Sequence, residues 1–209
     1  RADQALQDAS TETTRAVLTP DGAPGERYLI SAAGHLDTIR RHAGAGATIA
    51  LHLQDNLTAA ATTLTAARGR LETLTQQHSQ HPDIEPGLSL VRLRAEELTR
   101  MIETAAPLAA TAHGHISDAA RTAARLHSPD LRQEHRGFTI FQIDRGVHTI
   151  AEVLARAEET TRHLDRTVEN GLAAASRTLA QSEALTPSPP AHQPVLAPAG
   201  REHRIGPRR

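Results

Sequence analysis

Thirteen of the 209 residues are histidines, and these are the side chains whose type best suits metal chemistry. Imidazole binds zinc when three or four ligands converge on one point. His113 and His115 lie two residues apart in a helical pattern, so they diverge by about 200° around the helix and cannot share an ion. His78 and His81 are three apart, but they lie at a helix end beside a proline, and the sequence guarantees no third donor. We therefore expect no metal and no other cofactor.

One level of the predicted bundle is nevertheless rich in histidine. Antiparallel pairing about the turns would bring His52 and His148 to nearly the same height, although both lie at outward positions of their own helices. A metal- or ligand-responsive helical regulator that uses this level is therefore an alternative to the function favoured below.

Catalytic patterns are equally weak. The stretch HISD, residues 115–118, has only the neighbour spacing of a helix, without the strand–turn–helix elbow that activates a serine. Glu96 and Glu97 are adjacent, as are Glu158 and Glu159, so the members of each pair point to different sides of the helix. No HExxH, phosphate-binding loop, dinucleotide fingerprint or facing pair of Glu-x-x-His motifs occurs. We expect no enzyme and name no catalytic residue.

Composition indicates that helices carry these residues. One Tyr, two Phe and no Trp are too few for the core of a typical sheet domain, and the absence of Cys excludes disulfides and thiol chemistry. The 23 basic residues are all Arg, which indicates a GC-rich, bacterial genome. They nearly balance 24 acidic residues, giving a net charge of -1. The chain therefore lacks the overall field that attracts nucleic acid or anionic membranes.

Apolar residues recur at alternating spacings of three and four, the pattern of a heptad seam. Such seams run from Leu53 to Leu74, from Val91 to Leu126 and from Ile143 to Val168. They predict an all-α antiparallel bundle of three long helices with coiled-coil-like seams, one short N-terminal helix and a disordered C-terminal tail.

Turn signals set the predicted boundaries. Segments rich in Pro and Gly separate the seams, and Ser128 is a suitable N-cap before Pro129. We predict helices at about residues 2–18, 26–78, 87–127 and 129–185. Pro107 should kink the third helix without breaking it. The glycines of AGAGA, residues 43–47, should weaken or split the second helix.

Residues 1–185 are thus predicted to form one elongated helical bundle, and residues 186–209 a Pro-rich disordered tail. The arginines of the tail leave open a second alternative, a nucleic-acid-associated protein, but so few charges would give only weak, salt-sensitive binding. We do not expect nucleic acid as a partner.

No apolar run is long enough to span a bilayer and no signal peptide is visible, so we expect no membrane insertion and favour the cytoplasm. The sequence begins at Arg1 rather than Met, so it may lack its natural start. No family motif is recognised. The favoured function is a non-enzymatic scaffold or adaptor that contacts another protein or itself.

The predicted contact residues are Leu51, Phe138 and Phe141. Extending the third seam backwards places Ile140 and Ile143 inside, which leaves both phenylalanines facing water. We expect these rings to lie level with residues 46–51 and to be covered by a continuation of the first helix or by a partner helix. In the alternative arrangement, Gly137 shifts the phase of the helix and turns both rings inward.

Overall fold

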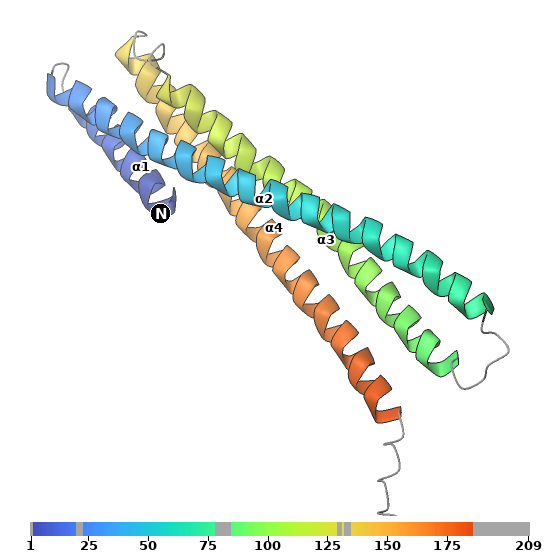
Figure 1. Ribbon diagram of the computed structural model, residues 1–209. Helices are drawn as coiled ribbons and strands as arrows, with labels where there is room; N and C mark the ends of the chain where they lie inside the picture. The colour runs from blue at the N-terminus through green and yellow to red at the C-terminus, as the bar shows by residue number, and fades with distance from the viewer. Residues whose placement is uncertain (1, 20–22, 78–84, 129–130, 132–134, 186–209) are drawn as a thin grey trace, which may run out of the picture.

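Four helices form the part of the chain that the computed structural model describes, which is residues 2–19, 23–77, 85–128, 131 and 135–185 (Figure 1). They are α1 (Ala2–Leu18), α2 (Ala23–Gln77), α3 (Glu85–His127) and α4 (Arg136–Leu185). No strand occurs among these residues. The predicted all-α bundle of three long helices and one short helix is confirmed.

The helices surround a common axis in the order of the chain. α3 packs against both α2 and α4, and α1 packs against α2 and α4 from the other side, whereas the diagonal neighbours hardly touch. Figure 1 shows that α1 runs beside only part of α2. We call the end where α1 ends and α2 begins proximal and the opposite end distal. The proximal half therefore has four helices and the distal half has three.

The core is larger in the four-helix half. Leu36, Ile39 and Ile150 are fully buried there, packed with alanines of α1 and α3. The distal cluster is formed around Ala105, Ala109 and Leu164. Alanine buries little apolar area, and hydrophobic stabilisation scales with that area at about 25 cal/mol per Å². The distal half therefore has the weaker core.

Two glycines allow α3 and α4 to approach closely. A Cβ atom on Gly146 would overlap the side chain of Leu126, and one on Gly171 would overlap Met101. These contacts also fix the register, because Leu126 lies level with Gly146 and Met101 with Gly171. Helices with such small contact residues pack at the lower end of the usual spacing, about 8 Å.

The last helix begins at Arg136 and not at about residue 129 with Ser128 as its N-cap, so this prediction is wrong. The amide of Ser128 donates to the carbonyl of Arg125, so this residue extends the end of α3. At the true start, the His135 carbonyl accepts the amide of Thr139, and Nδ1 of His135 accepts the amide of Gly137 at 3.3 Å. His135 therefore acts as the N-cap, because it satisfies an amide of the first turn.

The other predicted boundaries lie within three residues of those observed. α2 runs without a break through residues 43–47, so of the two expected outcomes there, weakening or a split, the split does not occur. α3 continues through Pro107, as predicted. Residues 186–209, the predicted tail, lie outside the described residues. No helix in the described part of the chain is long and apolar enough to cross a membrane.

Candidate partner-binding surfaces

Phe138 and Phe141 lie on the first two turns of α4, with 48% and 56% of their surface exposed. Ile143 is buried and Ile140 is half-buried on the opposite side of the same turns. This phase excludes the alternative in which Gly137 turns both rings inward. The two rings thus expose large aromatic surface on a chain with only these two phenylalanines.

Arg136 joins the beginning of α4 to the end of α1. Its Nη2 donates to the carbonyl oxygens of Ala16 and Thr19, at 2.7 and 3.0 Å. Ala16 belongs to the last turn of α1, and Thr19 directly follows the helix. Carbonyl groups at the end of a helix have no partner within the helix and need donors from outside it. The arginine therefore satisfies them and brings the C-terminal end of α1 to the level of the phenylalanines.

Other apolar side chains are exposed at the same end of the rod. We call the whole group the proximal apolar residues: Val17, Leu18, Ile30, Phe138 and Phe141. Isolated exposed apolar residues are ordinary, but several near one end are characteristic of contact surfaces.

A cavity of about 350 Å³ opens among α2, α3 and α4 at this end. Apolar side chains form most of its wall, and the polar ones are those of Glu26, Arg136 and Thr139. Thr139 is buried and donates its hydroxyl to the Leu131 carbonyl at 2.8 Å. The cavity is therefore suited to an inserted apolar side chain rather than to a polar reaction.

Leu51, the third predicted contact residue, is exposed but lies far from the phenylalanines. His127 reaches the carbonyl of Ala33, and Leu126 lies against Gly146, so Phe141 is level with α2 near Leu29. Leu51 is then on the order of 30 Å further along the rod. The predicted level was wrong because α4 begins at Arg136 and not near residue 129, which shifts α4 along α3.

The shift also separates the two predicted members of the His-rich level. His148 lines a surface hollow with Leu6 and Gln7 of α1, whereas His52 lies on α2 beyond Ala47, in the distal half. His78 and His81 fall outside the described residues. Among the described residues, no group of three or more His, Asp and Glu side chains has the arrangement of a metal site.

Two histidines of α3 have a structural role that the sequence did not reveal. Nδ1 of His113 lies 2.9 Å from the carbonyl oxygen of Ala47, and Nδ1 of His127 lies 3.0 Å from that of Ala33. A carbonyl only accepts, so each Nδ1 carries the hydrogen. The donors are two heptads apart, as are the acceptors, so the same contact recurs along the α2–α3 seam.

His115 is half-buried and has no corresponding contact with α2. In the HISD stretch, Ser117 pairs with His113 rather than with His115, at 3.5 Å, and Asp118 pairs with Arg121. A distance of 3.5 Å is long for a hydroxyl that must transfer its proton. This arrangement provides no activated nucleophile.

The paired carboxylates face arginines of their own helices. Arg162 contacts both Glu158 and Glu159, and Arg100 contacts Glu97 at 2.8 Å. Glu158, Glu159 and both arginines are exposed and Glu97 is half-buried, and ion pairs of this kind contribute little stability. They form a solvated surface rather than an acid–base pair.

Comparisons with known proteins give no relative. No protein-family model matches the chain, and neither curated proteins nor solved structures gave a match.

Proposed function

We propose that this chain is a non-enzymatic helical scaffold that binds another polypeptide through its proximal apolar residues. The observation that carries the proposal is the exposure of Phe138 and Phe141, the only phenylalanines of the chain. Aromatic side chains are enriched at the energetic centres of protein interfaces and depleted from surfaces that only meet water.

The surroundings of the two rings support this proposal. Beside the rings, the hydrogen bonds of Arg136 connect the beginning of α4 to the end of α1. The rings therefore project from a part of α4 that is attached to a neighbouring helix. The cavity among α2, α3 and α4 at the proximal end has mostly apolar walls and is large enough for a side chain of a partner. A rigid surface loses little conformational entropy when it binds.

Affinity capture from an extract of the source cells tests the proposal. The bait is the full chain, compared with a double variant Phe138→Ser/Phe141→Ser. The matched control is Val91→Ser/Leu93→Ser, which removes two similarly exposed apolar side chains from α3. We expect a partner that the wild-type and the control retain and that the phenylalanine variant loses by at least tenfold. Equal recovery by all three baits, or no recovery by any, would contradict the proposal.

A further inference from the structure

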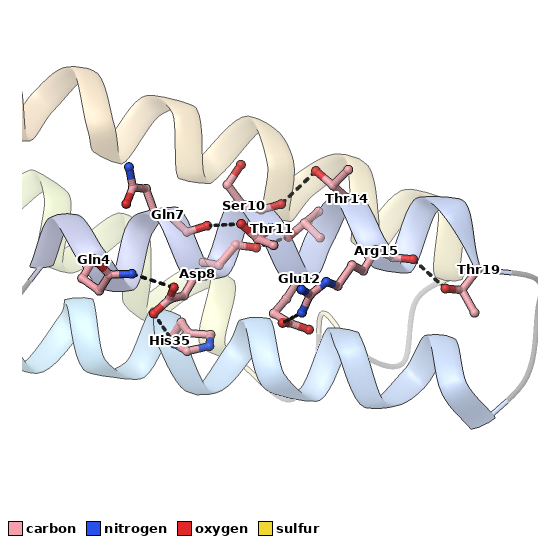
Figure 2. Close-up of polar contacts among 12 residues, drawn as sticks. Gln4, Gln7, Asp8, Ser10, Thr11, Glu12, Thr14, Arg15, Thr19 and His35 are labelled. Atoms are coloured by element: carbon pink, nitrogen blue, oxygen red, sulfur yellow. Dashed lines mark hydrogen bonds and ion pairs between the residues drawn. The ribbon is translucent and has the colours of Figure 1, made fainter.

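Among the described residues, three helices form the distal half of the rod and four form the proximal half. Asp8 of α1 lies 4.0 Å from His35 of α2 (Figure 2), so Ala2 is level with α2 near residue 41. From that level to the distal end, α2 and α4 continue with α3 between them. In the proximal half α1 packs against α2 and α4, and no described segment occupies the corresponding place in the distal half. The groove that binds α1 thus continues toward the distal end, and no helix of the described part of the chain lies in it.

The face of α2 that packs on α1 continues into this region. His35 and Ile39 mark that face, because His35 contacts Asp8 and Ile39 packs in the core with α1. Heptad spacing carries it on to Ile49 and to Leu53. These side chains are 70% and 40% exposed, although the corresponding residue of the proximal half, Ile39, is fully buried. The apolar stripe of α2 is therefore covered by α1 in the proximal half and becomes solvent-exposed beyond the level of Ala2.

The surface around the stripe is suited to contact with protein. No residue from Asn56 to Ala67 is charged. All four threonines of this stretch donate their hydroxyls to carbonyls of their own helix: Thr58, Thr62, Thr63 and Thr65. Such back-bonding satisfies the hydroxyl donor within the helix, so the methyl group contributes more of the surface. This part of α2 needs no partner for its polar groups.

We infer that a second copy of this chain fills the vacant place, packed antiparallel through the distal half of α2. The inference rests on the proposed function, because it assigns a self-contact to the same scaffold. α1 runs antiparallel to α2, and a twofold axis across α2 gives the partner's α2 this same direction. One contact then fills the groove of both chains.

A twofold axis at Ala60 pairs one large residue of the stripe with a small one. A twofold axis at that residue places Leu53 of each chain opposite Ala67 of the other, so a large side chain meets a small one. Both alanines are half-buried against their own chain and leave room for the incoming leucine. Because the stretch is uncharged, no like charges meet near the axis.

The available area is also sufficient. The uncovered part of α2, about residues 42–77, is about 50 Å long. A standard interface buries about 800 Å² per partner, which requires a strip about 16 Å wide over this length. α2 and α4 lie on either side of the groove, and each is about 10 Å across. Together they provide such a strip.

Single-cysteine variants test this arrangement, because the natural chain has no cysteine. Ala60→Cys places a thiol near the proposed axis, and air oxidation should give a disulfide-linked dimer in more than half of the protein. Thr62→Cys is the matched control, since it lies about 200° around the helix and its thiol should remain monomeric. Circular dichroism checks that both variants remain helical.

A second experiment tests the register. Leu53→Cys should not link to itself, because its two copies would lie on the order of 20 Å apart, but it should link to Ala67→Cys when the two proteins are mixed. Absence of both expected links, or equal linking through Thr62→Cys, overturns the inference. Either result shows that a second copy does not fill the groove in this arrangement. Loss of this dimer leaves phenylalanine-dependent capture intact, so failure of the inference is distinguishable from failure of the proposed function.

Discussion

The ring of His113 on α3 donates a hydrogen bond of 2.9 Å to the carbonyl oxygen of Ala47 on α2. His127 and Ala33 repeat this relationship at 3.0 Å, nearer the proximal end. Each acceptor is next to a glycine, because Gly34 follows Ala33 and Gly46 precedes Ala47. Few side-chain atoms therefore cover the backbone of α2 at these two positions. The two contacts fix the register of α2 against α3.

Removal of either ring should weaken the bundle. We predict that His113→Ala lowers the free energy of unfolding by about 1 to 2 kcal/mol, which is the loss of a hydrogen bond and some packing. His52→Ala, at an exposed position of α2, should change it by less than about 0.5 kcal/mol. Chemical denaturation followed by circular dichroism measures both. Equal effects would show that the contact of His113 contributes nothing.

Substitution of two glycines by alanine should have opposite effects. Gly146→Ala forces a methyl group into Leu126, and such overpacking costs about 1 to 3 kcal/mol. Gly69 lies in α2 with nothing within 4 Å of an added Cβ, so Gly69→Ala should stabilise the helix by up to about 1 kcal/mol. Thermal unfolding of the two variants checks the sign. Stabilisation by both would contradict the close α3–α4 packing.

Arg136 should control the attachment of α1. Arg136→Ala removes the donors to the carbonyls of Ala16 and Thr19, so amide hydrogen exchange in α1 should accelerate at least tenfold. Exchange in the distal half of α3 should not change. Arg156→Ala, an exposed residue in the middle of α4, is the control and should leave α1 protected. Unchanged exchange in α1 of the Arg136 variant would remove this role.

Asp37 gives the rod one defined dependence on pH. A hydrogen bond from Arg40 lowers the pKa of Asp37, and the charges of Arg40 and Arg41 act in the same direction. A carboxyl group whose pKa is lower in the folded state stabilises the fold above its unfolded pKa, about 3.9, and this contribution disappears as the pH falls through the folded pKa. Asp37→Asn should therefore lower the melting temperature slightly at pH 7 and not at pH 2. An equal difference at both pH values would contradict this sign.

Helix content was predictable because the heptad spacing is continuous along each seam. Leu18, Gln77 and His127 end their helices close to the predicted residues, since turn residues follow each of them. The phase of α4 was also predictable: Ile143 is buried, and Phe141 is exposed.

The relative level of the helices was not predictable. It depends on where each helix begins relative to its neighbour, and a heptad seam has nearly the same pattern after a shift by one repeat. The bonds from His113 and His127 depend on the register of α2 against α3. The cap by His135 was not predictable because histidine is not a usual N-cap. The uncovered face of the distal half of α2 likewise could be recognised only from the position of α1 in the structure.

The antiparallel dimer would give the scaffold two binding ends. Phe141 is level with Leu29 of α2, so an axis at Ala60 separates the two proximal ends by on the order of 90 Å. A rod of this kind would hold two partners at a fixed distance. A target with two binding sites would bind the dimer with higher affinity, because the second contact forms within the same complex.

Sedimentation equilibrium of the wild-type chain at micromolar concentrations measures the central claim most directly, namely that the scaffold is completed by a second copy through α2. The chain has a mass of 22.4 kDa, and we predict a species of twice this mass. Ala60→Glu should return it to the monomer, because two carboxylates would meet at the axis, whereas Phe138→Ser/Phe141→Ser should remain dimeric. A mass of 22.4 kDa for the wild-type at every concentration, or a dimer that only the phenylalanine variant dissociates, would contradict the account.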